Sequence, residues 1–280
     1  MIDETVTFSI PIADPLTAVL VCDLLWMNGV QGVEEIDIDG ESVLLRSSFG
    51  TTEADTLQRL ADLFGDWSPS LQWEISRVDP SITDSWKQFA QTIEITPSLR
   101  IVPAWLPQPN ERSNALEVVI DPGATFGMGD HPTTRGSLSL VSKRLQSGGT
   151  ILDVGCGSGV LGISALLLGA RRAQGIDINP ASVEVSRANA SRNGVDGRWS
   201  VSLDSLDTLS ERFDLIVANI LAPVLIELAE DLVRLLGDEG TLVISGVLRD
   251  RYDHVVKALS PLAIVDSIDV EGWTSLALRR

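Results

Sequence analysis

The sequence has few cysteines, the residues that build disulfides and thiolate metal sites, and it has no long apolar run of the kind that spans a membrane. Its two cysteines, Cys22 and Cys156, have no partner spacing that suits a metal ion, so we expect two reduced thiols and no metal. No apolar run approaches the roughly 20 residues that span a bilayer. Asp3 and Glu4 stand where a secretory signal would be basic and apolar, so we expect a cytoplasmic protein with no membrane partner.

Basic residues are also scarce, with 21 Lys and Arg against 39 Asp and Glu and a formal net charge of -18. Binding of a nucleic-acid backbone needs patches of Lys and Arg that displace counterions, so no direct binding of nucleic acid is expected. The negative charge favours a basic partner. It can equally serve solubility alone, because the charge of a whole chain does not show where that charge is concentrated.

What the sequence does contain is a glycine-rich turn between an apolar strand and a helix. Residues Ile151 to Gly162 read Ile-Leu-Asp-Val-Gly-Cys-Gly-Ser-Gly-Val-Leu-Gly. Glycines let the backbone approach a ligand where a Cβ would clash. A later strand, Gly175-Ile-Asp177, ends in a carboxylate that can accept a bond from each hydroxyl of a ribose. The two features predict a cofactor that contains an adenosine.

The glycine turn fits more than one class of cofactor, because Gly157-Ser-Gly-Val-Leu-Gly162 also matches the G-x-G-x-x-G motif of dinucleotide-binding proteins. Asp153 precedes the first glycine, which gives D-x-G-x-G-x-G, and the glycines are unusually dense. A carboxylate there repels a pyrophosphate but suits the ammonium of a methionyl group. S-adenosylmethionine is therefore favoured, with a nicotinamide or flavin cofactor and a purely structural turn as the alternatives.

Hydrophobic periodicity predicts two domains joined by a linker. Residues 1–80 follow the order strand, helix, strand, strand, helix, strand of a ferredoxin-like α+β module. Residues 81–112 read as a helical and proline-rich linker that carries Trp86 and Trp105. Residues 113–280 alternate strands and helices, which predicts an α/β domain with a doubly wound, Rossmann-like parallel sheet and an antiparallel finish.

The predicted elements set the places of the candidate residues. A ligand should lie over the carboxyl ends of the parallel strands, where Asp153, Asp177 and Asn219 fall. The first module has predicted strands over 6–10, 33–38, 42–47 and 71–78 and helices over 15–26 and 53–64. The second domain has predicted strands over 117–120, 151–154, 174–178, 199–203, 215–218, 241–245, 262–268 and 275–278 and helices over 135–145, 161–168, 181–193, 222–236 and 249–259.

Residues 121–134 form an unusual loop before a predicted helix, with three glycines, two prolines and one of the two histidines. Thr133 or Thr134 is expected to cap the helix or to bond a ligand, and the simpler alternative is a flexible connection with an ordinary threonine cap. His131 is either a proton acceptor or a residue that shapes the loop. No residue is assigned as a catalytic base.

Asn219 ends the fourth core strand, in the run Val-Ala-Asn-Ile-Leu. It is expected to bond cofactor or substrate, and the alternative is an asparagine that only satisfies a strand end. The residues after it, Ile220-Leu221-Ala222, include neither the prolines nor the aromatic residue that would stack on a planar acceptor. A planar amide or base as methyl acceptor is therefore less favoured.

Together these motifs resemble the ribosomal-protein L-eleven methyltransferase family, a family of class I S-adenosylmethionine-dependent enzymes. The resemblance rests on the loop from Asp121-Pro-Gly through Phe126-Gly-x-Gly-x-His-Pro-Thr-Thr134, the glycine turn, Gly175-Ile-Asp-Ile and Ala218-Asn-Ile-Leu. It extends along nearly all of the chain. Met128 and the linker triplet Thr83-Asp-Ser85 depart from the family's usual pattern, which leaves substrate identity and the number of methyl groups open.

The resemblance implies an enzyme that methylates lysine side chains and the N-terminal amine of a large-subunit ribosomal protein, with the N-terminal module binding that substrate. It implies that the cofactor S-adenosylmethionine contacts Thr134, Gly155, Gly157, Asp177 and Asn219. Three alternatives remain beside it: a lysine methyltransferase of another protein such as an electron-transfer flavoprotein subunit, a small-molecule methyltransferase, and a module that senses the cofactor without catalysis.

Overall fold

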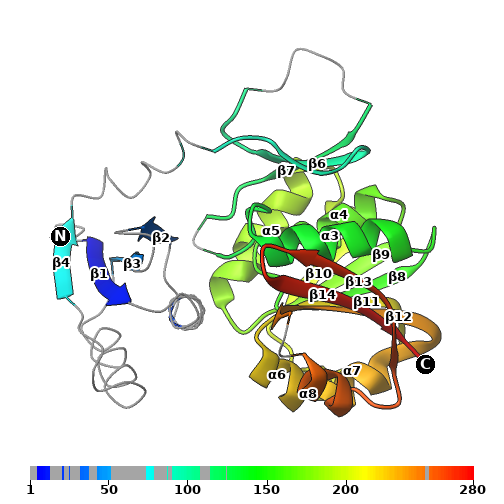
Figure 1. The fold of residues 1–280 in the computed structure, drawn as a ribbon. Helices are drawn as coiled ribbons and strands as arrows, with labels where there is room; N and C mark the ends of the chain where they lie inside the picture. The colour runs from blue at the N-terminus through cyan, green and yellow to red at the C-terminus, as the bar shows by residue number, and fades with distance from the viewer. Residues whose placement is uncertain are drawn as a thin grey trace. The chain divides into compact units, whose positions relative to one another are not determined.

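The computed structural model describes residues 5–12, 21, 25, 32–37, 43–51, 74–78, 87, 90–107, 114–123, 125–249 and 252–280. The chain divides into two compact units, residues 1–90 and residues 91–280, which we describe one at a time (Figure 1). In the described part of the chain, no helix is both long enough and apolar enough to cross a membrane.

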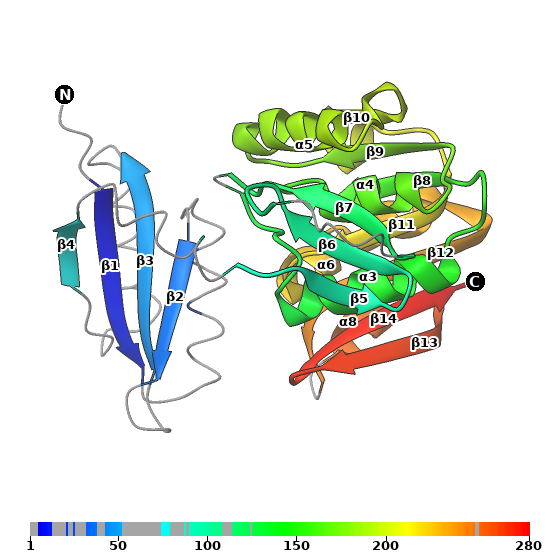
Figure 2. The ribbon, with the colours of Figure 1, turned by 90° about the horizontal axis from the view of Figure 1, so that it is seen from above.

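The N-terminal unit contains a four-stranded antiparallel sheet (Figure 2). The strands lie in the order β2-β3-β1-β4, so the strand that comes first in the chain lies inside the sheet, between β3 and β4. This arrangement agrees with the expected ferredoxin-like α+β module. The strands are β1 (Thr5–Ile12), β2 (Gly32–Asp37), β3 (Val43–Thr51) and β4 (Glu74–Val78).

Only part of the two predicted helices of this unit can be compared with the structure. Val21 and Leu25 are helical and fully buried, and their spacing of four residues places them on one face of a helix. The other residues of both predicted helices lie outside the described residues, as does the predicted turn at Asp39-Gly40. The strands on either side of the predicted turn, β2 and β3, pair in antiparallel fashion, with Asp37 opposite Val43.

A seven-stranded sheet forms the centre of the second unit, in the order β10-β9-β8-β11-β12-β14-β13 (Figure 1). The five strands from β10 to β12 are parallel, and β14 and β13 close the sheet in antiparallel pairing. The predicted doubly wound, Rossmann-like sheet with an antiparallel finish is therefore confirmed. The strands are β8 (Thr150–Val154), β9 (Arg172–Ile176), β10 (Trp199–Ser202), β11 (Phe213–Asn219), β12 (Leu236–Leu248), β13 (Ala263–Val270) and β14 (Trp273–Arg279).

The helices of this unit follow the prediction, with two differences. The helix expected over 222–236 is divided into two helices that meet at Leu228, and the helix expected over 249–259 begins at Asp253. The α-helices are α3 (Pro132–Arg144), α4 (Val160–Leu167), α5 (Pro180–Arg192), α6 (Ala222–Glu227), α7 (Ala229–Leu235) and α8 (Asp253–Ala258).

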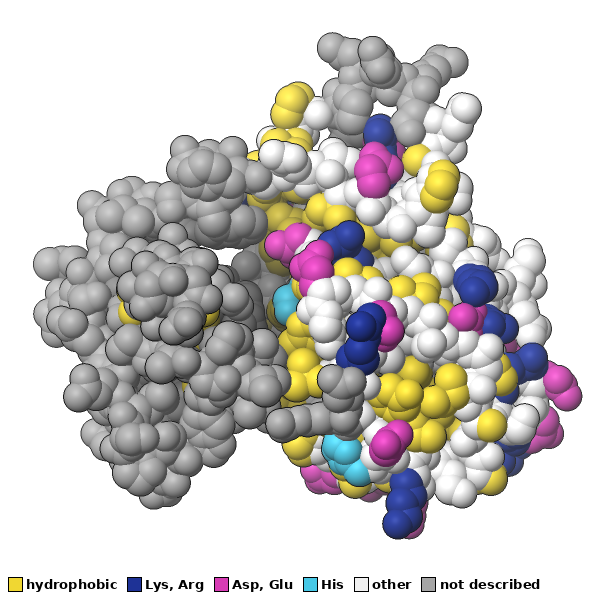
Figure 3. Space-filling model, viewed as in Figure 1, with side chains coloured by type: hydrophobic (Ala, Val, Ile, Leu, Met, Phe, Trp, Pro, Cys, Tyr) yellow, Lys and Arg dark blue, Asp and Glu magenta, His cyan; other side chains and the backbone are white. Residues whose placement is uncertain are grey.

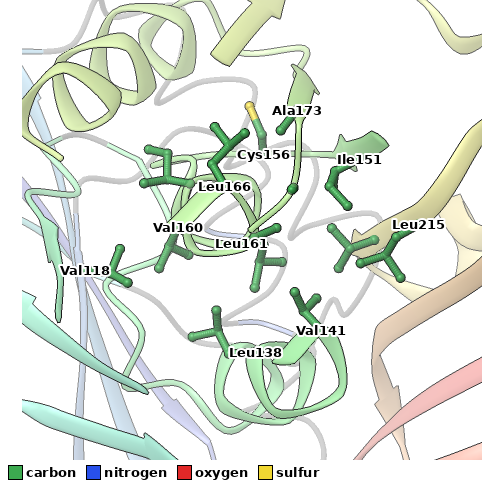
Figure 4. Packing of buried hydrophobic residues seen from close by; sticks show 14 of the residues in the cluster. Val118, Leu138, Val141, Ile151, Cys156, Val160, Leu161, Leu166, Ala173 and Leu215 are labelled. Atoms are coloured by element: carbon green, nitrogen blue, oxygen red, sulfur yellow. The ribbon is translucent and has the colours of Figure 1, made fainter. Parts of the chain in front are cut away.

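Two hydrophobic clusters pack against the two faces of the sheet, because alternate residues of a strand point to opposite faces. In β8, Ile151 belongs to one cluster and Leu152 to the other. Helices α3 and α4 contribute Leu138 and Leu161 to the cluster of Ile151, as Figure 4 shows. Because all four of these side chains are nearly or fully buried, the core fixes the strand ends from which the site is built.

A separate sheet has three strands, two of which lie in the predicted proline-rich linker over 81–112, while the third matches the strand predicted over 117–120. Its strands are β5 (Ile93–Thr96), β6 (Leu99–Pro103) and β7 (Leu116–Ile120), in that order. Leu99 and Ile101 are fully buried in the same cluster as Ile151. The prolines do not prevent the strands, because Pro97 lies in the turn after β5 and Pro103 is the last residue of β6. The domain boundaries at residues 80 and 112 stay a prediction.

Candidate cofactor site

The site lies at the point where the parallel sheet changes its direction of winding. The chain winds outward from β8 to β9 and β10 on one side and from β11 to β12 on the other. In open α/β sheets, ligands bind at the carboxyl ends of the strands at such a point. The structure brings the predicted residues to this edge, since Gly155 and Gly157 follow β8, Asp177 follows β9 and Asn219 ends β11.

The turn after β8 needs glycine for two reasons. Gly155 and Gly157 have φ values of 68° and 51°, in the left-handed region that side chains other than glycine rarely adopt. A Cβ at Gly157 would lie 2.5 Å from the carbonyl oxygen of Phe126, and a Cβ at Gly155 would lie 2.5 Å from Cγ2 of Ile220. Both glycines therefore let two other segments of the site approach the turn closely.

The third glycine of the dinucleotide-like fingerprint, Gly162, has a packing role. A Cβ at Gly162 would lie 2.3 Å from the indole ring of Trp199, and a Cβ at Gly175 would lie 2.5 Å from the same ring. Trp199 is buried and donates from Nε1 to the hydroxyl of Ser186 at 3.4 Å. These two glycines therefore make room for one tryptophan that contacts both α4 and β9.

The N-terminus of α4, where a dinucleotide-binding fold receives a pyrophosphate, is bonded by the protein's own side chains. Asp153 Oδ2 accepts the N–H of Gly162 at 2.8 Å, and Ser158 Oγ accepts the N–H of Val160 at 3.3 Å. Asp153 and Ser158 are both fully buried. Two of the N–H groups that would bind a phosphate are thus already satisfied, one of them by a carboxylate. This favours a nucleoside without a pyrophosphate over the nicotinamide and flavin alternatives.

The structure corrects one expectation about Asp153. Its side chain has no exposed surface, because β8 is buried along its whole length, so a direct contact with a methionyl ammonium is not available to it. Burial raises the pKa of Asp153 to about 7, while the N–H of Gly162 lowers that pKa and the charge of Asp177 raises it. Within the described part of the chain, Oδ1 has no hydrogen-bond partner. The carboxylate joins β8 to α4.

Asp177 is fixed by the glycine turn itself. Its Oδ2 accepts the N–H of Gly157 at 2.8 Å, and its Oδ1 accepts the N–H of Asn179 at 2.9 Å. A carboxylate has about four acceptor positions, so both oxygens keep the capacity to accept a further bond from a ribose hydroxyl. The half-buried side chain is thus held in place and still accessible.

Two exposed apolar side chains that are not among the predicted site residues extend this edge. Ile178, directly after Asp177, is 91% exposed, and Leu203, directly after β10, is 51% exposed. Because β9 and β10 are neighbouring parallel strands, both residues follow carboxyl ends of the sheet. An apolar surface beside a carboxylate suits a purine attached to a ribose. The sequence feature that could have predicted this surface is Ile178, an apolar residue directly after the acid that follows β9.

The structure also brings Thr134 and Asn219 together. The amide Nδ2 of Asn219 donates to Oγ1 of Thr134 at 3.4 Å, which joins the end of β11 to the start of α3. The alternative of a threonine cap is wrong, because the N-cap of α3 is His131, whose Nδ1 accepts the N–H of Thr133 at 3.3 Å. Thr134 is instead fully buried beside Asn219.

Ser158 attaches the loop of residues 121–134 to the glycine turn. Its N–H donates to the carbonyl oxygen of Phe126 at 3.0 Å, and its hydroxyl donates to the carbonyl oxygen of Gly127 at 2.6 Å. The loop is therefore bonded to the turn that the cofactor is expected to contact. This role of Ser158 cannot be predicted from the sequence, because serine in a glycine turn gives no sign of its distant partner.

Asn189 of α5 and Asn193, the residue that caps its C-terminus, satisfy the outer edge of β7 in the way that a neighbouring strand would. Asn193 accepts the N–H of Val119 at 2.9 Å and donates to its carbonyl oxygen at 2.7 Å. Asn189 accepts the N–H of Asp121 at 3.0 Å and donates to its carbonyl oxygen at 2.9 Å. Asn189 also donates to the carbonyl oxygen of Ser158 at 2.9 Å. Helix α5 thus fixes the start of the loop and the glycine turn together.

Cys156 lies within the glycine turn as a filler of space. Its side chain is buried, and burial is the main cause that raises the pKa of its thiol. The nearby charges of Asp153 and Asp177 raise that pKa further. A thiol in these surroundings stays protonated and is a poor nucleophile. Cys22 lies outside the described residues.

S-adenosylmethionine fits the donors and surfaces at this edge. A positioned carboxylate, a close-packed glycine backbone and an exposed apolar side chain suit its adenosine, and the helix terminus that a pyrophosphate would need is already satisfied. The strand order, the D-x-G-x-G-x-G turn and the acid after β9 define a Rossmann-like methyltransferase.

Comparison with known proteins identifies the family. The family model described as Ribosomal protein L11 methyltransferase (PrmA) matches residues 31–280. The ribosomal protein L11 methyltransferase of Pseudomonas paraeruginosa is 40% identical over 232 residues, which cover 82% of this chain and 78% of that protein. That of Marinobacter nauticus is 34% identical over an alignment 290 positions long, and the alignment covers 96% of each chain. The chain therefore belongs to the ribosomal protein L11 methyltransferase family, as the resemblance predicts.

A solved structure supports the same assignment. The crystal structure of the ribosomal protein L11 methylase from Lactobacillus delbrueckii subsp. bulgaricus is similar to this chain with a TM-score of 0.63 and 30% sequence identity. The similarity covers 69% of this chain and 98% of that one.

Replacement of Asn189 tests the amide contacts of α5. We expect Asn189→Ala to lower the free energy of unfolding by roughly 2–4 kcal/mol, because it leaves part-buried backbone groups of Asp121 and a buried carbonyl group of Ser158 without partners. Urea denaturation followed by circular dichroism measures the change. Ser191→Ala, on the exposed side of the same helix, should stay within about 0.5 kcal/mol of the wild type. A loss of similar size in both variants would contradict the role of Asn189.

Replacement of Asp153 by Asn tests the buried carboxylate. Its pKa is raised from 3.8 to about 7 by folding, so the folded protein binds more protons than the unfolded chain between those values. The protonated carboxyl group stabilises the folded protein. This stabilisation is complete at pH values below the pKa of Asp153 in the unfolded chain, and it is lost as the pH rises through the pKa of Asp153 in the folded protein. The unfolding free energy of Asp153→Asn minus that of the wild type should therefore increase by about 1 kcal/mol or more when the pH is raised from about 5 to about 8. Urea titrations at the two pH values measure this, and an unchanged difference would argue against the raised pKa.

Proposed function

We propose that this chain transfers methyl groups from S-adenosylmethionine to amino groups of ribosomal protein L11, namely lysine side chains and the N-terminal amine. Membership of the family supports the substrate. The hydrogen bond from the Gly157 N–H to the Asp177 carboxylate is the main observation that supports the assignment of the site. It holds a carboxylate that can accept bonds from ribose hydroxyls against the glycine turn, at the point where the sheet changes its direction of winding.

The proposed chemistry is an in-line displacement in which an amine lone pair attacks a methyl group. When bound, S-adenosylmethionine supplies that methyl on a positively charged sulfur. A lysine side chain has an unperturbed pKa near 10.4, so the site must favour its neutral form. We infer that the loop of residues 121–134 excludes water from the incoming amine and aligns it, because alignment supplies much of the acceleration in such reactions.

No catalytic base is proposed. His131 is the titratable side chain of the loop nearest to Thr134 in the sequence, and burial lowers its pKa, against the charges of Asp130 and Glu271. Its Nδ1 lies 2.7 Å from the hydroxyl of Thr133 and caps α3. These contacts support the alternative in which His131 shapes the loop.

The distribution of charge supports a basic protein as substrate. Residues 1–90 contain 16 acidic and 4 basic side chains, a net charge of -12, so most of the charge of the whole chain belongs to the N-terminal unit. A concentrated negative charge attracts basic partners and speeds their association. We propose that this unit binds the ribosomal protein. Action in the cytoplasm without direct contact to nucleic acid or membrane stays a prediction.

Methyl transfer can be tested with the purified chain, labelled S-adenosylmethionine and ribosomal proteins from a strain that lacks the enzyme. Mass spectrometry should locate the label on amino groups of L11. Label on another protein would favour the alternative protein substrates, and label on a small molecule would favour that class. Binding of the cofactor without any transfer would contradict an enzymatic role.

Replacement of Asp177 tests the ribose contact. We expect Asp177→Ala to weaken binding of S-adenosylmethionine by about 100-fold or more, because two hydrogen bonds to a charged group are lost and the Gly157 N–H loses its partner. Isothermal titration calorimetry measures the affinity. Asp196→Ala removes an exposed carboxylate on the same unit and should leave the affinity unchanged. Equal affinities in the wild type and Asp177→Ala would contradict the assigned role.

A further inference from the structure

The C-terminal hairpin ends in an unusual two-residue turn. Val270 of β13 pairs with Trp273 of β14, and the turn between them is Glu271-Gly272. Both turn residues have positive φ, 50° for Glu271 and 85° for Gly272, which is the geometry of a tight hairpin turn. Glutamate rarely adopts that conformation. Its side chain forms an ion pair with Arg135 of α3 at 3.0 Å, so the turn is attached to the start of that helix.

The first residue after this turn reaches the loop of residues 121–134. The indole of Trp273, only 9% exposed, meets the imidazole of His131 edge-on, with ring centroids 5.5 Å apart and an interplanar angle of 65°. Phe126 meets the same imidazole edge-on, at 5.5 Å and 69°. His131 is therefore in contact with aromatic rings from two segments far apart in the sequence, an arrangement that aromatic rings favour.

The contacts continue from His131 into the cofactor site. His131 caps α3, and the third residue of that helix, Thr134, accepts the bond from Asn219. Phe126, on the other side, accepts the N–H of Ser158 in the glycine turn through its carbonyl oxygen. A displacement of His131 would thus move the second half of the loop, from Phe126 to Thr134, relative to the carboxyl ends of the strands.

We propose that Trp273 is a positioning residue for methyl transfer: through its contact with His131, the tip of the C-terminal hairpin holds the loop of residues 121–134 over the glycine turn. The inference rests on the proposed function of that loop, which places it beside the incoming amine. It assigns to the C-terminal hairpin a part in the reaction as well as in the sheet.

The titration of His131 reports this contact directly. Burial is the main cause that lowers the pKa of His131, and Trp273 is one of the groups that bury it. The charged groups around it are Asp130 in the loop and Glu271 at the hairpin tip, which raise that pKa, and Arg135 on the next turn of α3. Removal of the indole should expose the ring to water, and the pKa of His131 should then rise.

The experiment compares the whole chain carrying Trp273→Ala, Trp273→Phe or Leu278→Ala with the wild type. The chain has only two histidines, so a proton NMR titration with His254→Gln as the assignment variant follows His131 alone. We expect the pKa of His131 to rise in Trp273→Ala and to stay near the wild-type value in Trp273→Phe, which keeps an aromatic edge. Leu278→Ala weakens the same strand far from the loop and should leave that pKa unchanged.

The kinetic part separates positioning from stability. In Trp273→Ala we expect kcat for methyl transfer to fall on the order of 100-fold, with a change of less than about tenfold in the Kd for S-adenosylmethionine, because a small displacement near reacting atoms costs much of the rate. Leu278→Ala should keep the wild-type kcat per folded molecule. An unchanged kcat and an unchanged pKa of His131 in Trp273→Ala, or equal losses in Leu278→Ala, would overturn the proposal. Absence of methyl transfer by the wild type would instead overturn the proposed function, while the titration still tests the contact.

Discussion

The hydrogen bond from the Gly157 N–H to the Asp177 carboxylate is the interaction on which the cofactor edge depends. At 2.8 Å it joins the segments that follow two neighbouring parallel strands, and the second oxygen of Asp177 is bonded to Asn179. Phe126 and Ile220 approach the same turn so closely that side chains at Gly157 or Gly155 would collide with them. The edge is therefore one connected structure, in which the turn, the loop and the end of β11 constrain one another.

The parts of this structure that the sequence predicts are those with local signals. An apolar run followed by dense glycines predicts a buried strand and a tight turn, because both requirements act within a few residues. The alternation of strands and helices predicts a parallel sheet, and the sheet then determines that Asp177 and Asn219 meet at one edge. For the same reason the sequence alone predicts the doubly wound fold and the candidate residues at this edge.

The parts that the sequence does not predict depend on partners far along the chain. Asn189 bonds Asp121 across 68 residues, and Trp199 determines why Gly162 must be glycine. His131 replaces the expected threonine cap, which the local preference for threonine does not reveal. Neighbouring prolines favour a linker where β5 and β6 form, and the sequence does not show that Leu99 is fully buried in the core. In each of these cases tertiary packing decides the role of the residue.

The two classes of cofactor that share a G-x-G-x-x-G run can be distinguished by the group that accepts hydrogen bonds from the N–H groups at the start of the following helix. A dinucleotide supplies its own anion, so the N–H groups at the helix start must remain free for the pyrophosphate. In this protein Asp153 and Ser158 occupy those groups from inside the core. A pyrophosphate would have to displace a fully buried carboxylate and would meet its charge at close range, which is costly in a low dielectric. Asp153, the acid before the first glycine, thus disfavours a dinucleotide because it already bonds the start of the helix. S-adenosylmethionine, which has no pyrophosphate, can instead be recognised through Asp177 after the next strand.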